Sequence, residues 1–436
     1  MNKKEFAKRR QHLIDLMGPN SIAVLPSIPV ANRNRDVDYI YRSDSSFHYL
    51  SGFDEPDAVI VIIPGRPHGE YLLFCRERDL SKEIWDGYRA GQEGAINTFG
   101  ADDSYPISDL DDILSGLLEG KEKVYYTMGN VPSFDQRMVG WLNHLRNASR
   151  QGMHSPTEII ELEHSLNELR LYKSGAEIKA MRTAAKVSTD AHIRAMQFTK
   201  VGKWEYQVEA EIIHEFMKND CRSPAYPSIV GGGENGCILH YIENNHKLKS
   251  NDLLLIDAGA EYDYYAADIT RTFPVNGKFT ACQKAVYNIV LEAQKAAIAE
   301  VKPGNHWNRP HEAAVRVITQ GLLDIGLLKG KLEVLIKEEK YREFYMHRTG
   351  HWLGMDVHDV GDYKVGGEWR VLEPGMVLTV EPGLYIRDPK HIDKKWHFIG
   401  IRIEDDVLVT KTGNEVLTDA APKEVDDIEE LMAKAG

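Results

Sequence analysis

The sequence has few cysteines and no long hydrophobic run. Its four cysteines are far apart in the 436-residue chain and form no CxxC pair: Cys75, Cys221, Cys237 and Cys282. This spacing argues against a disulfide framework and against a thiolate metal site. The longest apolar runs, such as residues 58–63, fall far short of the roughly 20 residues that cross a bilayer, and the basic start lacks the apolar core of a secretory signal. We therefore expect a soluble, cytoplasmic protein.

The chain also lacks an excess of positive charge. It carries 53 lysines and arginines against 66 aspartates and glutamates, a formal net charge of −13. The acidic residues are spread along the chain rather than gathered in a tail. This balance argues against nucleic acid and against anionic membrane surfaces as partners.

Length favours two domains, because 436 residues exceed one ordinary core. The first third alternates helical and extended patterns, which predicts a small α/β domain. A polar stretch over residues 147–156 interrupts the alternation, and a long helical segment is expected from Glu158. We place an N-terminal domain at residues 1–172 and a C-terminal domain at residues 173–436. In the first, helices are expected at residues 4–17, 110–118 and 134–145, and strands at residues 21–25, 58–63, 70–75 and 123–127.

The C-terminal domain opens with a helix signal. Ser174 and Glu177 form a capping-box pattern, and Thr280 and Gln283 form a second one, so a helix should begin at each. Apolar runs between and after the helices predict strands, which makes the whole chain α/β (α+β) with two similar C-terminal halves. The expected helices cover residues 175–199, 205–218, 281–301 and 310–325, and the expected strands cover residues 252–256, 264–273, 376–380 and 400–409.

Several of these strands end in acidic residues. Asp257 closes the run 252–256, Asp268 lies in the next run, and Glu381 follows residues 376–380. A charge at the end of a buried strand is costly unless a partner compensates it. An ion pair with Arg271 is one explanation for the two aspartates, and a metal site is the other.

The run at residues 400–407 adds a further acid with a defined direction. Successive side chains of a strand point to opposite faces, so Ile401 and Ile403 share one face while Arg402 and Glu404 share the other. The side chain of Glu404 is therefore expected to point the same way as that of Arg402.

A segment rich in histidine and glycine lies between these runs, from His347 through His351 to His358. Histidines four apart can bind zinc from one helix, but no HExxH glutamate is present and Gly350 and Gly354 disfavour a helix. We expect loop-borne histidines, although an isolated histidine is more often a hydrogen-bonded packing residue.

Two aspartates, two glutamates and one histidine make an oxygen-rich set of donors. Such a set suits manganese, magnesium or iron(II) better than a thiolate-preferring ion, although zinc or cobalt can also occupy it. Four carboxylates balance the charge of two divalent cations. Two adjacent cations can lower the pKa of a shared water and stabilise a developing oxyanion.

At these residues the sequence resembles the pita-bread metallopeptidases, which include aminopeptidase P, prolidase, methionine aminopeptidase and creatinase. The likeness to bacterial aminopeptidase P covers almost the whole chain. It implies a small N-terminal α/β domain for substrate access and oligomerisation, a C-terminal pita-bread catalytic domain, and a homo-dimer or homo-tetramer. It also implies two Mn²⁺ per chain, with other divalent ions as substitutes, and five ligands: Asp257, Asp268, His351, Glu381 and Glu404.

The resemblance further assigns roles to residues around the ions. Asp268 and Glu404 would bridge both ions, and Glu381 would also act as general base. Catalytic or substrate-binding positions are implied for His240, His347, His358, Tyr385 and Arg402. Trp85 matches a tryptophan that reaches a neighbouring subunit's substrate pocket, and Asp36 and Arg150 match polar residues there. Arg348 departs from the pattern, since relatives usually have a small residue after the first histidine.

The implied activity is removal of the N-terminal residue from peptides whose second residue is proline. Proline lacks an amide hydrogen and has a fixed ring geometry, so a pocket shaped for the ring is the expected source of selectivity. Two alternatives stay open. One is an Xaa-Pro dipeptidase (prolidase), with organophosphate hydrolysis as a side activity, and the other is a non-enzymatic peptide-binding module.

Overall fold

The computed structural model describes residues 1–388 and 390–434. By compactness the chain divides into two units, Met1–Leu169 and Arg170–Gly436. The sequence-based boundary between residues 172 and 173 falls slightly further along and stays a prediction. In the described part of the chain, no helix combines the length and apolar composition needed to cross a membrane.

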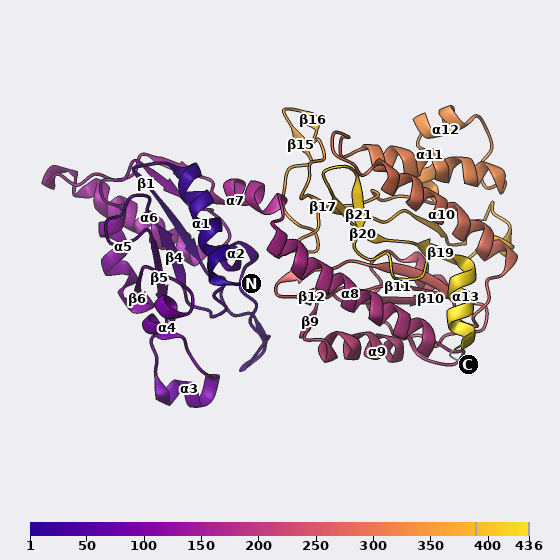
Figure 1. The fold of residues 1–436 in the computed structure, drawn as a ribbon, viewed down its shortest axis with the longest axis horizontal. Helices are drawn as coiled ribbons and strands as arrows, with labels where there is room; N and C mark the ends of the chain where they lie inside the picture. Colours follow the sequence, from indigo (N-terminus) through magenta and orange to yellow (C-terminus); the bar gives the residue numbers. More distant parts are fainter. Residues whose placement is uncertain (389, 435–436) are drawn as a thin grey trace. The chain divides into compact units, whose positions relative to one another are not determined.

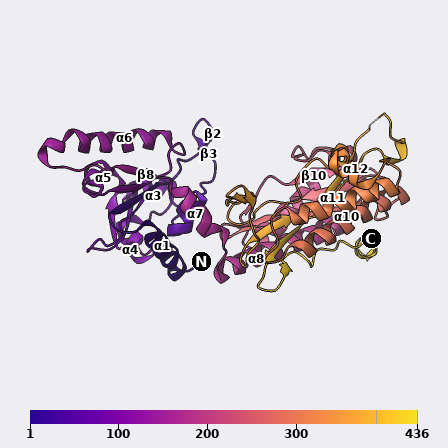
Figure 2. The same cartoon turned by 90° about the horizontal axis from the view of Figure 1, so that it is seen from above.

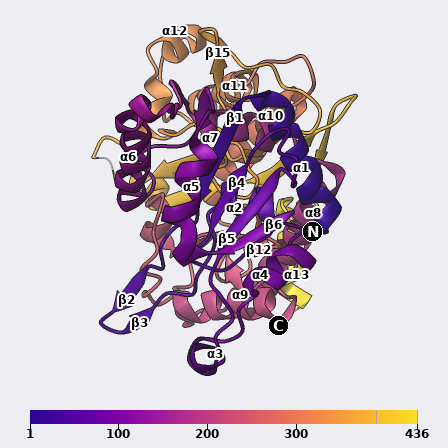
Figure 3. The same cartoon turned by 90° about the vertical axis from the view of Figure 1, so that its left-hand side faces the viewer.

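The N-terminal unit is built on a mixed six-stranded sheet in the order β6-β5-β4-β1-β7-β8. Figures 2 and 3 show α5 and α6 on one face of this sheet and α1 and α4 on the other. Leucines of α5 and aromatic residues of α6 pack against the sheet as one buried cluster. The strands are β1 (Ser21–Pro26), β4 (Val59–Ile62), β5 (Tyr71–Cys75), β6 (Asp103–Pro106), β7 (Lys123–Tyr125) and β8 (Glu158–Ile160).

Helices and a hairpin complete this unit. They are α1 (Lys3–Met17), α2 (Ser45–Ser51), α3 (Leu80–Asp86), α4 (Gly91–Asn97), α5 (Leu110–Leu118), α6 (Pro132–Asn147), α7 (Leu162–Leu171), which crosses the boundary, and the hairpin of β2 (Asn32–Asn34) and β3 (Val37–Asp38). The predicted helix from Glu158 is wrong at its start. Residues 158–160 instead form β8, which pairs in parallel with β7, and the β-branched Ile159 and Ile160 suit a strand.

In the C-terminal unit, strands lie between two pairs of helices. Figure 1 shows them with α8 and α9 on one side and α10 and α11 on the other. Both capping boxes are confirmed: the Ser174 and Thr280 side chains accept from the N–H groups of Glu177 and Gln283, whose side chains bond back. The helices are α8 (Gly175–Phe198), α9 (Glu205–Lys218), α10 (Ala281–Glu300), α11 (Arg309–Asp324), α12 (Leu332–Lys337) and α13 (Val425–Lys434).

The strands of this unit form several small sheets. One joins β10 (Ile229–Gly232), β11 (Leu253–Asp257) and β14 (Thr270–Pro274), and a second joins β17 (Val377–Val380), β20 (Asp405–Val409) and β21 (Asn414–Val416). A third sheet holds β13 (Tyr265–Ala266), β12 (Ala260–Tyr262) and β9 (Ser223–Pro224). The two-stranded pairs are β18 (Gly383–Ile386) with β19 (Ile399–Arg402), and β15 (Lys364–Val365) with β16 (Glu368–Trp369).

Two predicted strands are each divided into two shorter ones. The run at residues 400–409 forms β19, which pairs with β18, and then β20, which pairs with β17. The run at residues 264–273 forms β13 and β14, which belong to different sheets. Glu404 lies at the first break and Asp268 at the second, so each acid occurs where a strand changes partner.

Candidate metal centre

The five predicted ligands line one cavity of about 260 Å³ in the C-terminal unit. Asp257 is the last residue of β11, and Asp268 lies in the short segment between β13 and β14. Glu381 lies between β17 and β18, Glu404 between β19 and β20, and His351 in the loop before β15. Chain segments far apart in the sequence therefore deliver their acids to one place.

Three of these residues are close enough to share one ion. Ligand atoms of Asp268, His351 and Glu404 all lie within 4.8 Å of one another. His351 Nε2 is 3.3 Å from Asp268 Oδ2 and 3.8 Å from Glu381 Oε1. The Tyr226 hydroxyl lies 2.6 Å from Asp257 Oδ1 and 2.5 Å from Asp268 Oδ1. The Tyr226 hydroxyl is therefore within hydrogen-bonding distance of both carboxylates.

Burial and neighbouring carboxylates raise the pKa values of the acids in the cavity. Burial raises the pKa of Glu404 well above its ordinary value, and the neighbouring carboxylates of Asp268 and Glu381 raise it further. Burial also raises the pKa of Glu381 to about 7, although His351 and Arg402 act in the opposite direction. Carboxylates packed this closely are stabilised in the ionised form by cations. The donor set therefore fits divalent metal ions.

His351 is oriented as a metal ligand would be. Its Nδ1 donates to the Trp352 carbonyl at 2.9 Å, which leaves Nε2 facing the acids. Burial alone would lower the pKa of His351, but Asp268 and Glu381 raise it to about 9. Since a ligand imidazole must be neutral, binding of an ion at this position displaces a proton.

The histidine loop is held against β17 by main-chain contacts. The Thr379 N–H donates to the His351 carbonyl at 3.0 Å, and the Glu381 N–H donates to the Thr349 carbonyl at 2.8 Å. A Cβ atom at Gly350 would lie 2.0 Å from the Thr379 carbonyl oxygen, so this approach requires glycine. The prediction of loop-borne histidines is confirmed.

Arg402 connects two acids of the cavity. Its Nη2 donates to Asp257 Oδ2 at 2.6 Å, and its Nε donates to Thr270 Oγ1 at 3.0 Å. Thr270 Oγ1 in turn donates to Glu404 Oε2 at 2.6 Å, so Arg402 and Glu404 do point the same way. The alternative pairing of the aspartates with Arg271 is wrong, because Arg271 pairs with Asp405 at 2.7 Å.

Three other histidines that were predicted to bind substrate or take part in catalysis line the same cavity: His240, His347 and His358. The ring of His358 is 4.3 Å from that of His351. His347 Nε2 accepts from the Tyr385 hydroxyl at 2.9 Å, and Tyr385 also accepts from Arg402 Nη1 at 3.0 Å. Burial, with Arg402 adding to it, lowers the pKa of His347 to about 4. Burial, with His351 adding to it, lowers the pKa of His358. Both are therefore neutral hydrogen-bonding groups at neutral pH.

Three predicted residues lie in the N-terminal unit, and all three are exposed. Trp85 is on α3 with 86% of its surface accessible. Asp36 is in the turn between β2 and β3, and Arg150 is in the short 3-10 turn Ser149–Gln151. Their roles stay predictions.

Two residues at the site carried no prediction. Thr270 had a usable signal, because it shares the alternate face of its strand with Asp268 and Thr272. Thr272 Oγ1 contacts the main chain of Arg402, donating to its carbonyl at 3.1 Å. Tyr226 had none, since it lies in a short irregular segment whose sequence shows no periodicity.

Comparisons with known proteins identify the family of this chain. The family model described as "Metallopeptidase family M24" matches residues 179–411, and "Aminopeptidase P, N-terminal domain" matches residues 6–125. This chain belongs to metallopeptidase family M24. The predicted family and the mixed α/β fold with a pita-bread domain are confirmed.

Relatives of this M24 chain match it along its whole length. The Xaa-Pro aminopeptidase of Escherichia coli (strain K12) is 45% identical over 436 residues, which cover 100% of this chain and 99% of the relative. Xaa-Pro aminopeptidase 3 of Rattus norvegicus is 36% identical, and the match covers 100% of this chain and 87% of the relative. The structure of Pseudomonas aeruginosa aminopeptidase PepP is 58% identical with a TM-score of 0.99, covering 100% of this chain and 99% of that chain.

Proposed function

We propose that this M24 metallopeptidase removes the N-terminal residue from peptides whose second residue is proline. The observation that carries the proposal is the convergence of four carboxylates and one imidazole on one cavity, in a chain that matches Xaa-Pro aminopeptidases from end to end. A solved structure of E. coli aminopeptidase P in complex with substrate, a glutamate-to-alanine variant, is 44% identical with a TM-score of 0.97 and covers 100% of this chain and 99% of that chain. These relatives favour the aminopeptidase over the prolidase alternative.

The proposed cofactor is a pair of Mn²⁺ ions. The chain would hold them with the five lining residues: Asp257, Asp268, His351, Glu381 and Glu404. Four carboxylates balance two divalent charges, and an oxygen-rich set suits manganese. When bound, the ions would supply Lewis-acid and water-activating chemistry.

The roles of the protein groups follow from their environment. Glu381, which lines the cavity beside the proposed ions, would take a proton from water and pass it to the leaving proline nitrogen. The neutral His358 would donate a hydrogen bond to the scissile carbonyl oxygen. His240 and His347 would bind and orient the peptide from the cavity wall, with Tyr385 and Arg402 behind His347.

Assembly of several copies is also proposed. On and next to α3 four apolar residues are largely exposed: Leu80 at 74%, Ile84 at 82%, Trp85 at 86% and Tyr88 at 92%. Clustered apolar exposure of this kind marks an interaction surface. A homo-dimer or homo-tetramer would cover it and bring Trp85, with Asp36 and Arg150, to a partner's substrate pocket.

The proposed location is the cytoplasm. All four cysteines are free thiols, and three of them are buried: Cys75, Cys221 and Cys237. Unpaired cysteines are typical of proteins in a reducing compartment.

A two-peptide assay tests the activity. Protein loaded with Mn²⁺ is incubated with Ala-Pro-Ala and with Ala-Pro, and released alanine is measured by chromatography. We expect efficient, chelator-sensitive cleavage of the tripeptide. Cleavage of the dipeptide alone would establish a prolidase instead, and manganese-dependent turnover of neither peptide would favour a binding module.

A further inference from the structure

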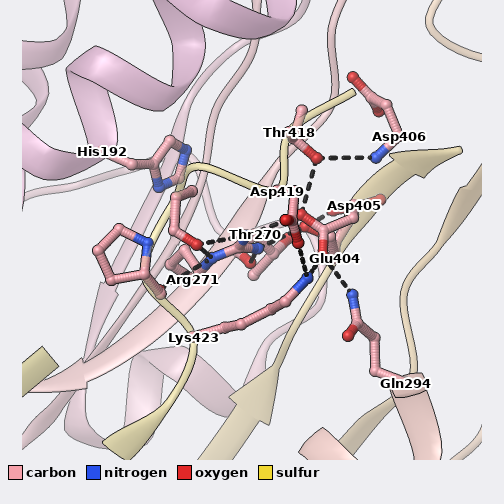
Figure 4. A network of polar contacts seen from close by, with 12 residues as sticks. His192, Thr270, Arg271, Gln294, Glu404, Asp405, Asp406, Thr418, Asp419 and Lys423 are labelled. Atoms are coloured by element: carbon pink, nitrogen blue, oxygen red, sulfur yellow. Dashed lines mark hydrogen bonds and ion pairs between the residues drawn. The ribbon is translucent and has the colours of Figure 1, made fainter. Parts of the chain in front are cut away.

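A buried network of polar and charged side chains surrounds Asp405, the residue next to Glu404 in the chain (Figure 4). Asp405 is at its middle, and both of its carboxylate oxygens accept two hydrogen bonds. Oδ1 accepts from Arg271 Nη2 and Thr418 Oγ1, each at 2.7 Å. Oδ2 accepts from Gln294 Nε2 at 2.6 Å and from Lys423 Nζ at 2.7 Å. We call these five residues the Asp405 network.

Stability alone does not explain this network. The side chains of Arg271 and Asp405 are both fully buried. Removing two charges from water is costly, and apolar side chains of similar volume are often as stabilising as a buried ion pair. A buried pair of this kind points to a geometric task.

Arg271 fixes the main chain of Glu404. Its Nη1 donates to the Glu404 carbonyl at 2.6 Å and to the Thr270 carbonyl at 3.0 Å. The Glu404 N–H donates to the same Thr270 carbonyl at 3.1 Å. Both polar main-chain groups of Glu404 are therefore held, and Thr270 Oγ1 holds one oxygen of its side chain.

Asp406 fixes the main chain of Asp268, another of the predicted ligands. Its two carboxylate oxygens each lie 3.2 Å from the main-chain nitrogen of Asp268, which donates to them. The Asp406 N–H donates to Thr418 Oγ1 at 3.1 Å, so Thr418 joins Asp405 to Asp406. Three consecutive acids thus have three different tasks. Glu404 lines the cavity, Asp405 pairs with Arg271, and Asp406 accepts from Asp268.

We propose that Arg271, Asp405 and Asp406 are positioning residues that hold Glu404 and Asp268 in the geometry needed to bind the metal pair. The inference rests on the proposed metallopeptidase function. None of the three lines the cavity, so their loss should weaken metal binding while leaving peptide recognition intact. Groups that orient metal ligands typically change metal affinity by roughly 10–100-fold when they are mutated.

The test compares three variants with one matched control. Asp405→Asn removes the charge that pairs with Arg271, and Thr418→Val removes the hydroxyl between Asp405 and Asp406 with little change in volume. Arg271→Lys keeps the charge but loses the fork that reaches the Glu404 carbonyl. The control is Asp419→Asn, because Asp419 accepts from the same Lys423 at 3.1 Å on the exposed side.

Mn²⁺ binding to metal-free protein is measured by titration calorimetry, and the coupled ion pair is followed by electron paramagnetic resonance. We expect each of the three variants to bind at least one Mn²⁺ roughly 10–100-fold more weakly. Excess Mn²⁺ should restore kcat with KM for Ala-Pro-Ala unchanged. The control should match the wild type in every measurement.

If the folded Asp405→Asn and Thr418→Val proteins bind two Mn²⁺ as tightly as the wild type, the positioning role is overturned and the proposed function is unaffected. If Asp405→Asn does not fold, Thr418→Val decides. Wild-type binding by Arg271→Lys would also overturn it, because charge without the fork would then suffice. A wild-type protein that binds no Mn²⁺ pair would overturn the proposed function and this inference together.

Discussion

Glu381 shows how surroundings give one carboxyl group a task at neutral pH. An exposed glutamate is ionised above pH 5 and is a weak base. At the end of β17, burial and the nearby Asp268 and Asp257 raise the pKa of Glu381 to about 7. A proton carrier is most effective when its pKa lies near the working pH. The placement of this residue, rather than its type, therefore brings its pKa near neutral pH in the metal-free protein, and bound cations would favour its ionised form.

Replacing Glu381 by alanine should abolish turnover without unfolding the protein. Loss of a general acid or base typically costs about 10²–10⁴ in rate, and loss of a metal ligand adds to this. The measurements are kcat on Ala-Pro-Ala and the thermal unfolding midpoint. Glu368→Ala serves as the control, because Glu368 is exposed on β16. Turnover within a few-fold of the wild type would contradict the role of Glu381.

Removal of metal should make stability depend on pH. In the metal-free fold the pKa of Glu381 is raised to about 7 and that of His351 to about 9. In the unfolded chain the corresponding values are about 4.3 and about 6.5. A raised folded pKa gives stability that is lost as pH rises through it. Metal-free protein should therefore lose stability between about pH 4.3 and pH 9, with Glu381 responsible for the part below about pH 7 and His351 for the part above about pH 6.5.

The measurement is the unfolding midpoint of chelator-treated and Mn²⁺-loaded protein across that range. The gap between the two should widen as pH rises, because bound ions replace the lost protons as partners of the acids. Glu381→Gln should show a shallower loss in the metal-free state. A constant gap would argue against metal binding at these groups.

At the scale of elements, local signals predicted helices better than strands. The capping boxes at Ser174 and Thr280 placed the starts of α8 and α10, because a cap depends on residues three apart. The breaks at Asp268 and Glu404 depend on partner strands distant in the sequence, so no local pattern marked them. The predicted ligands meet in one cavity, but Tyr226 and the task of Arg271 depend on tertiary contacts that the sequence does not encode locally.

The loop that carries His351 and His358 is anchored by a buried ion cluster. Asp359 accepts from Arg170 Nη2 at 2.7 Å and from Lys173 Nζ at 2.9 Å. Asp359→Asn should destabilise the protein by about 3–5 kcal/mol, because the buried Lys173 loses its counter-charge and Arg170 keeps only its pairing with Asp356. Chemical denaturation measures this change, with the exposed Asp362→Asn as the matched control. An effect below about 1 kcal/mol would contradict the anchoring role.

The same aspartate should give the wild type an acid-side signature. Burial alone would raise the pKa of Asp359, but Lys173 and Arg170 lower it. The stability it contributes is therefore complete above the ordinary aspartate pKa of about 3.9 and is lost as pH falls through the lower folded value. The asparagine variant should lack this part of the acid-induced loss.

At the scale of the whole molecule, the two units present different surfaces. The C-terminal unit encloses its chemistry in a cavity lined by charged and polar groups. The N-terminal unit exposes apolar side chains on and beside α3, a helix with no buried residue. Short helices gain most of their stability from packing, so the proposed assembly would cover α3 with another copy.

Placing a charge on α3 should weaken assembly. Ile84→Lys introduces a cation into the exposed apolar surface, so sedimentation velocity should show a shift towards smaller species. Leu16→Lys, at a residue 56% exposed on α1, is the control. An unchanged oligomeric state in the Ile84 variant would exclude α3 from the interface.

The run Glu404-Asp405-Asp406 should tolerate neither an insertion nor a deletion. Because neighbouring side chains in extended chain point to opposite sides, a slip of one residue would turn the ion-pairing acid towards the cavity and the ligand towards the guanidinium. Each acid would then face the wrong neighbour. Natural variation in length should therefore accumulate in the surrounding loops, and this tripeptide should keep its register even where its flanks diverge.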